Sequence, residues 1–230
     1  METFATQLVS LSNPSSFAAE QYQNLRLKIE RLRQTRDLRV IAVTSPGASE
    51  GKTITSINLA GALARGQASR VLLVDADLRR PQVAEHLHIP DSSAGFADLI
   101  AGGQVTLQDA IRPLDGFNVD VMPAGGIAGP IHDVFRSARL PQLLSHVRNR
   151  YDYIVLDTPP LVPVVDSALL SRVVDGVLVV VSANKTRRKL LEEALNEMDA
   201  AKVLGIVFNN DDRPLFGYDH NYRRYFARKH

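Results

Sequence analysis

The chain has 230 residues, no cysteine and a formal net charge of +2. With 45% hydrophobic and 23% charged residues it has the composition of a globular protein, which excludes disordered, collagen-like and fibrous classes for most of the chain. The absence of cysteine excludes disulfide scaffolds, zinc sites with thiolate ligands and cysteine nucleophiles.

The first 36 residues predict an arm followed by a helix. Residues 1–16 include LSNPSS, a cluster of turn-forming residues that predicts a loop or a loosely held arm. Apolar residues then recur at helical spacing and predict an amphipathic helix that begins at Phe17 and ends within residues 34–36. These apolar residues are Ala18, Tyr22, Leu25, Ile29 and Leu32.

Short runs of β-branched residues follow at intervals along the rest of the chain. They are apolar without alternation, which is typical of parallel strands buried on both faces between helices. Helical patterns over about 52–66, 140–149, 166–173 and 186–200 separate most of them. This order predicts an α/β, doubly wound domain with a mainly parallel sheet. The predicted strands are Val40–Thr44, Val71–Ala76, Phe117–Met122 (the weakest run), Tyr153–Asp157, Gly176–Ser182 and Val203–Asn209.

A single domain is expected, because nothing between residues 40 and 209 has the composition of a linker. We assign residues 1–16 to an N-terminal arm, residues 17–209 to the domain with its N-terminal helix 17–36, and residues 210–230 to a flexible tail. The tail carries three of the six tyrosines and has no clean periodicity. A short terminal helix packed on the domain is the alternative.

The strongest motif is SPGASEGKT, residues 45–53, between the first predicted strand and a helix. Backbone N–H groups of such a turn lie at the positive end of the helix dipole, which suits a nucleotide phosphate. Lys52 would reach the β- and γ-phosphates, and the Thr53 hydroxyl would bind Mg²⁺. Pro46 replaces the first glycine of the usual GxxxxGK[ST] pattern. The expected nucleotide-binding residues are Gly47, Ala48, Ser49, Glu50, Gly51, Lys52, Thr53 and Ile54.

Acidic residues end two of the predicted strands. Asp75 and Asp77 lie in LLVDADLRRP, and Asp157 lies in YDYIVLDTPP. Ligands of open α/β sheets bind at the carboxyl ends of the strands, so these carboxylates are expected near the glycine-rich loop. Each one alone is also explained as a helix cap or loop residue. Three together suit a metal–triphosphate, and they predict a P-loop NTPase.

These segments resemble the bacterial tyrosine kinase family. LLVDADLRRP is similar to the family's Walker A′ motif and YDYIVLDTPP to its Walker B motif. LVSLSNPSSFAAEQYQNLRLKI, DGVLVVVSANKTRRK and VLGIVFNN also resemble family segments, so the resemblance covers nearly the whole chain. It implies the deviant Walker A class, which includes the Min and partitioning ATPases. Their signature lysine would fall at Gly47, so that subclass fits less well.

The resemblance implies transfer of the γ-phosphoryl group of ATP to a tyrosine hydroxyl, with Mg²⁺ as cofactor. Lys52 would stabilise the transferring group, and Thr53, Asp77 and Asp157 would bind the metal directly or through water. Asp75 is the first candidate to orient or deprotonate the tyrosine, although Asp75 and Asp77 could exchange roles. Asn209 matches the position where this class reads adenine.

The family's substrates are tyrosines of its own C-terminal tail, used in trans between the subunits of a ring. The candidate phosphoacceptors are Tyr218, Tyr222 and Tyr225, a thin cluster whose neighbouring arginines could instead simply solvate the tail. The helix 17–36 would be the oligomerisation helix. Its polar face carries Glu20, Gln23 and Arg26, with Gln23 in place of an arginine, which removes one charge-assisted hydrogen bond.

Location and partners are also expectations at this point. No apolar run approaches the roughly 18 residues of a membrane span, and residues 1–10 lack the features of a secretory signal. The resemblance implies a cytoplasmic regulator of capsule or exopolysaccharide synthesis and export, recruited to the membrane by a separate membrane-anchored activator. It also allows other protein-tyrosine substrates, and no nucleic acid is expected. The alternatives are a Min- or partitioning-type ATPase switch at membrane or DNA, and a regulatory subunit that binds ATP without catalysis.

Overall fold

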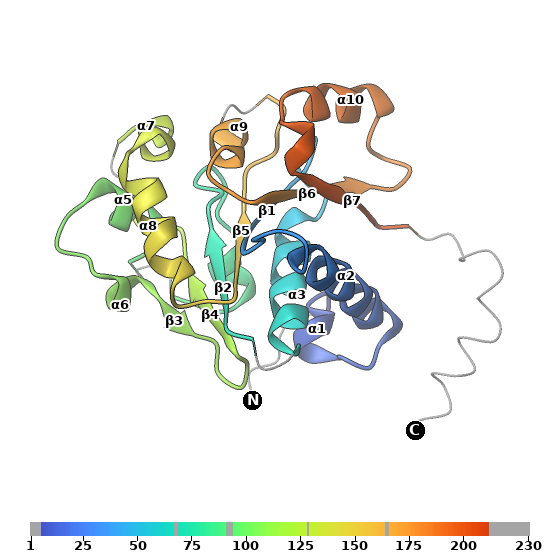
Figure 1. The fold of residues 1–230 in the computed structure, drawn as a ribbon, viewed down its shortest axis with the longest axis horizontal. Coiled ribbons are helices and arrows are strands. Elements are labelled where there is room, and N and C mark those ends of the chain that lie inside the picture. Colours follow the sequence, from blue (N-terminus) through green and yellow to red (C-terminus); the bar gives the residue numbers. More distant parts are fainter. Residues whose placement is uncertain (1–5, 67–68, 91–93, 128, 164–165, 212–230) are drawn as a thin grey trace.

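The computed structural model describes residues 6–66, 69–90, 94–127, 129–163 and 166–211. At its centre lies a seven-stranded sheet with the order β3-β4-β2-β5-β1-β6-β7 (Figure 1). All neighbouring strands pair in parallel except β3, which is antiparallel to β4. The predicted doubly wound, mainly parallel sheet is therefore confirmed. The strands are β1 (Val40–Thr44), β2 (Val71–Asp75), β3 (Arg112–Pro113), β4 (Val119–Met122), β5 (Tyr153–Asp157), β6 (Gly176–Ser182) and β7 (Val203–Asn209).

Helices cover both faces of this sheet. One hydrophobic cluster joins one face to α1 (Val9–Ser12), α2 (Phe17–Arg33) and α3 (Lys52–Ala64). The other joins the opposite face to α5 (Phe96–Ala101), α7 (Ile131–Arg136), α8 (Arg139–Arg148), α9 (Asp166–Ser171) and α10 (Arg188–Asn196). Figure 1 shows α2 and α3 on one side and α7 and α8 on the other. The short helices α4 (Val83–His86) and α6 (Leu107–Ala110) and a 3₁₀ turn (Ala200–Lys202) complete the described elements.

The N-terminal arm differs from the prediction. Its residues 9–12 form α1, and both Leu8 and Leu11 are buried. Ser10 N–H donates to Asn58 Oδ1 at 2.9 Å, and Asn58 Nδ2 donates to the Gln7 carbonyl at 2.9 Å. Because Asn58 belongs to α3, these bonds fix the arm to the helix that follows the glycine-rich loop. The expected loop or loosely held arm is therefore wrong for residues 8–12, where a helix of one turn is too short to show periodicity.

Replacing Asn58 with alanine is expected to release the arm. The side chain is fully buried, so its loss leaves the Ser10 N–H and the Gln7 carbonyl without their bonds, at a cost of about 1–3 kcal/mol in the free energy of unfolding. Thermal denaturation measures the loss, and hydrogen exchange at Ser10 locates it. Asn149→Ala, at an exposed helix end, is the control. Unchanged protection of the Ser10 amide in Asn58→Ala would contradict this account of the arm.

The helix predicted for oligomerisation is present as α2, which ends at Arg33. Its polar face is bonded within the helix, since Arg26 Nε donates to Gln23 Oε1 at 3.0 Å and Arg26 Nη1 pairs with Glu30 Oε1 at 3.0 Å. Glu20 lies in the first turn. Among the described residues no helix combines the length and apolar character needed to cross a membrane. The candidate phosphoacceptors Tyr218, Tyr222 and Tyr225 lie outside the described residues.

Candidate active site

A cleft of about 830 Å³ opens at the carboxyl ends of the central strands. Its walls come from the loop between β1 and α3, the loop after β2, residues 160–163 and the end of β7. The arm and α2 add a further wall through Gln7, Val9, Ala18 and Tyr22. The predicted residues that line the cleft are Ala48, Ser49, Gly51, Lys52, Thr53, Ile54, Asp77 and Asn209. This is the edge at which parallel α/β sheets bind ligands.

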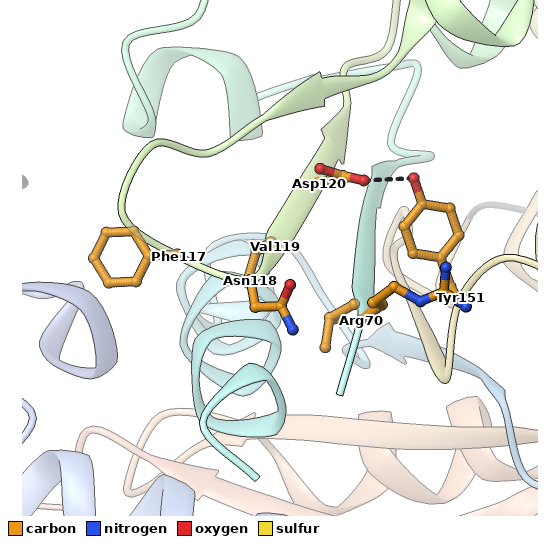
Figure 2. A pocket seen from close by; sticks show the side chains of 7 residues that line it. Arg70, Phe117, Asn118, Val119, Asp120 and Tyr151 are labelled. Carbon is orange, nitrogen blue, oxygen red and sulfur yellow. Dashed lines mark hydrogen bonds between the residues drawn. The ribbon is translucent and has the colours of Figure 1, made fainter. Parts of the chain in front are cut away.

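A second cavity lies at the opposite edge of the sheet (Figure 2). It measures about 80 Å³, room for only a few water molecules, and is lined at the amino ends of β2 and β4 by residues such as Arg70 and Phe117. The Tyr151 hydroxyl donates to Asp120 Oδ2 at 2.6 Å beside it. Burial raises the pKa of Tyr151, so this hydroxyl stays protonated and acts as a donor. The substrate-sized site is therefore the large cleft.

Two residues of the glycine-rich loop adopt a left-handed backbone conformation. Gly51 has φ of 89°, and a Cβ atom there would lie 2.0 Å from Asn209 Nδ2, so a side chain is excluded on both grounds. Ser49 has φ of 61° without being glycine, a strain of roughly 1–2 kcal/mol of the kind found at binding loops. Asn209 Nδ2 donates to the Glu50 carbonyl at 2.9 Å and so ties the end of β7 to this loop.

Glu50 holds the loop in place from the inside. Its buried carboxylate accepts the Gly47 N–H at 3.1 Å through Oε1. Through Oε2 it accepts the Ser182 N–H at the end of β6 at 3.2 Å and the Thr186 hydroxyl just beyond this strand at 2.7 Å. The Glu50 side chain therefore serves the loop's shape, and its backbone is what remains to face a phosphate. The sequence pattern predicts Glu50 as a nucleotide-binding residue without distinguishing its side chain from its backbone.

Replacing Glu50 with alanine is expected to weaken ATP binding about tenfold, which corresponds to about 1.4 kcal/mol, because the loop loses its anchor to β6. Calorimetric titration with ATP measures the effect. Glu85→Ala, on an exposed position of α4, is the control and should bind ATP as the wild type does. A lower melting temperature with unchanged ATP affinity would show that Glu50 serves stability alone.

Four of the predicted residues converge on one buried network. Lys52 Nζ lies 2.7 Å from Asp77 Oδ2 and 4.0 Å from Asp157 Oδ2. The Thr53 hydroxyl donates to Asp157 Oδ2 at 2.7 Å. Ser56, one turn along α3, donates to Asp157 Oδ1 at 3.1 Å, a contact that the motif does not predict because Ser56 lies outside it. Lysine and carboxylates thus meet at the start of α3, where phosphate charge would be held.

The positive charge in this network does not balance the negative charge of its carboxylates. Burial raises the pKa of Asp157 to about 6, although the Lys52 ammonium opposes the shift. Burial and the nearby Asp157 raise the pKa of Asp75 to about 8. Burial alone would lower the pKa of Lys52, but the carboxylates outweigh it and raise that pKa, so the ammonium stays charged. A further cation would relieve the crowding of the carboxylates.

Asp75 does not face the cleft. Its carboxylate is fully buried, with Oδ1 accepting the Asp77 N–H at 3.2 Å. Its Oδ2 accepts the N–H groups of Gln82 at 3.1 Å and Val83 at 3.0 Å, which closes the loop that follows β2. The structure therefore places Asp77, and not Asp75, toward a ligand. The direct contact with tyrosine expected for Asp75 is not supported by this geometry, which favours the exchanged roles.

The oxygen donors of the network suit Mg²⁺. This ion keeps several waters and takes one or two protein ligands together with substrate phosphates. Thr53 and Asp157 present such oxygens side by side, and Asp77 lies across Lys52 from them. Within the described part of the chain no three acidic, histidine or cysteine residues form a metal site by themselves. The donor set therefore fits an ion shared with a nucleotide.

Comparisons with known proteins identify relatives of this chain. Residues 38–203 match a family model described as an AAA domain. The chain is 30% identical over 188 residues to the tyrosine-protein kinase CpsD of Streptococcus agalactiae, covering 80% of this chain and 81% of that protein. It is 30% identical to the succinoglycan biosynthesis transport protein ExoP of Rhizobium meliloti over 93% of this chain, but it spans only 29% of the length of ExoP.

Solved structures with a similar fold were also found. The crystal structure of the chimerical protein CapA2B2 matches with a TM-score of 0.84 at 26% identity, covering 91% of this chain and 92% of that one. The cell division ATPase MinD of Pyrococcus furiosus matches more distantly, with a TM-score of 0.59 at 22% identity over 82% of this chain and 79% of that one. The match with MinD shows a common fold and nothing more.

Proposed function

This chain belongs to the AAA domain family, in the group of the bacterial tyrosine-protein kinases, and from that premise we propose that it is an ATP-dependent protein-tyrosine autokinase. The observation that carries the proposal is the convergence of Lys52, Thr53, Asp77 and Asp157 on one cleft beside the glycine-rich loop. Phosphoryl transfer needs this combination, because its catalysis consists mainly of positioning and charge stabilisation.

At phosphorus the proposed reaction forms one bond and breaks one. The phenolic oxygen of tyrosine bonds to the γ-phosphorus of ATP, the bond from that phosphorus to the β–γ bridging oxygen breaks, and ADP leaves. Backbone N–H groups of the loop hold the phosphates, and the Lys52 ammonium moves from Asp77 to the γ-phosphoryl oxygens. Mg²⁺, held by Thr53 and Asp157, would neutralise phosphate charge.

Asp77 is proposed to receive the phenolic proton or to orient the hydroxyl, since it lies on the cleft and loses its lysine partner when phosphate binds. Asp75 is proposed as a positioning residue, because its three backbone bonds fix the loop that carries Asp77. Asn209 is proposed to contact adenine from the end of β7. This strand lies on one side of β1, and β2, which precedes Asp77, lies on the other.

The finer parts of the proposal concern substrates and partners. Tyr218, Tyr222 and Tyr225 are proposed as phosphoacceptors used in trans between subunits of a ring that α2 assembles through Glu20, Gln23 and Arg26. A separate membrane-anchored activator is proposed to recruit the protein to the cytoplasmic face of the membrane. The similarity to a succinoglycan transport protein supports a role in exopolysaccharide synthesis and export.

The test is phosphotyrosine formation by the purified chain with Mg-ATP and the cytoplasmic segment of the activator. We expect antibody-detected phosphotyrosine and intact-mass increases in steps of one phosphate group. ATP hydrolysis that DNA or anionic lipid stimulates, without phosphotyrosine, would instead indicate a Min-type switch. Tight ATP binding with neither hydrolysis nor transfer would indicate a regulatory subunit.

A further inference from the structure

The cleft has a nucleotide side and an acceptor side, and the order of the strands distinguishes them. The glycine-rich loop follows β1 at the centre, β7 with Asn209 lies to one side, and β5 and β2 lie to the other. A nucleotide proposed to extend from Asn209 along the loop ends its phosphates near Lys52 and Asp77. The part of the cleft beyond Asp77 is therefore where a phosphate acceptor would enter.

Two arginines and a histidine line this acceptor side. They are Arg79, Arg80 and His86, which we call the acceptor rim, and all three come from the loop after β2 and from α4. The only carboxylate among the residues lining the cleft in the described part of the chain is Asp77, which pairs with Lys52. Among the described residues that line the cleft, no carboxylate is therefore left to balance the two arginines of the rim.

The two arginines are held differently. Arg79 Nε donates at 2.7 Å to Asp166 Oδ2, a carboxylate that is 1% exposed, so one edge of this guanidinium is fixed against α9. Arg80 is exposed, and its guanidinium forms no ion pair with any other residue that the structure describes. Its backbone N–H donates to Asp77 Oδ1 at 3.2 Å, which places Arg80 next to the proposed tyrosine-facing carboxylate.

We propose that the acceptor rim selects tyrosines whose neighbours are acidic, with Arg80 as its main contact. The proposal rests on the proposed kinase function. A carboxylate beside the target tyrosine would pair with the rim, whereas a neighbouring arginine would be repelled. In this chain Tyr218 precedes Asp219, while Arg223 and Arg224 separate Tyr222 from Tyr225. Tyr218 is therefore the preferred acceptor among the three.

The test compares two peptides of equal length, each with one tyrosine, flanked either by aspartates or by arginines. The full chain is assayed with Mg-ATP and activator, and kcat/KM is measured for each peptide. We expect about a tenfold preference for the acidic peptide, from roughly two partly exposed charge pairs. Arg80→Glu should reverse the preference, and Arg150→Glu, at an exposed position beyond α8, should leave it unchanged.

The possible outcomes distinguish a failure of the proposal for the acceptor rim from a failure of the proposed kinase function. Equal rates for both peptides in the wild type, or an Arg80→Glu variant that keeps the acidic preference, would overturn the proposal. A raised KM for ATP with an unchanged peptide ratio would assign Arg80 to the nucleotide and overturn it as well. If the wild type labels neither peptide nor itself, the proposed function fails first. Site mapping over time supplies a second measurement, in which Tyr218 should be labelled before Tyr222 and Tyr225.

Discussion

Lys52→Met is expected to lower tyrosine phosphorylation about a thousandfold, the largest loss that one substitution should cause in this protein. Within the part of the chain that the structure describes, the Lys52 ammonium is the one cation that pairs with Asp77 and Asp157 at the start of α3. Its charge stays on the nitrogen, because the surrounding carboxylates raise its pKa. Methionine keeps the length of the side chain but cannot stabilise charge on a transferring phosphoryl group.

A loss of stability would accompany this substitution, so the measurement must separate the two effects. The side chains of Lys52 and Asp77 are 10% and 3% exposed, and removal of one partner of a buried ion pair costs about 3–5 kcal/mol. Phosphotyrosine formation is therefore assayed below the melting temperature of the variant. Lys189→Met, on an exposed position of α10, is the control. A folded Lys52→Met protein with wild-type rates would place the chemistry elsewhere.

The central strands could be predicted from the sequence almost to the residue. β1, β5 and β6 have the predicted bounds, because runs of Val, Ile and Leu buried on both faces leave no alternative pattern. The partly exposed edge strand β7 also has the predicted bounds. The short elements could not be predicted. Arg112–Pro113 is too brief a strand to show any period, and α1 is fixed by the distant Asn58. Contacts between segments that are far apart in the sequence determine these short elements, and a local sequence pattern cannot predict such contacts.

The candidate site divides in the same way. The convergence of Lys52, Thr53 and Asp157 follows from strand ends and a P-loop, both of which are readable in sequence. The burial of Asp75 could not be predicted from the sequence. Asp75 and Asp77 are alike in type and lie two residues apart, and only the folded loop that donates to Asp75 decides which of them is covered. Asp166, which fixes Arg79 from α9, also carried no local signal.

Asp157→Asn is expected to raise the stability of the protein while it lowers catalysis, whereas Lys52→Met lowers both. The carboxyl is fully buried with a pKa of about 6, above the value of about 4 in an unfolded chain, so the folded state takes up a proton between these values. Its ionisation therefore costs stability as the pH rises through this window, and the whole cost is present above pH 6. Asparagine removes that cost, and we expect a higher melting temperature than the wild type at pH 8, with the gain shrinking toward pH 4.

The same substitution should reduce phosphotyrosine formation about a hundredfold at millimolar Mg²⁺, because a neutral amide replaces a proposed anionic ligand and the hydrogen bond from Thr53 is to a weaker acceptor. A titration with Mg²⁺ checks this cause, since more Mg²⁺ should recover part of the rate. Ser56→Ala removes a hydrogen bond to the same carboxylate and keeps its charge, so it should retain the wild-type dependence on Mg²⁺. If Asp157→Asn and Ser56→Ala showed the same dependence on Mg²⁺, Asp157 would act by holding α3 and not by holding the metal, because Ser56→Ala keeps the charge of the carboxylate.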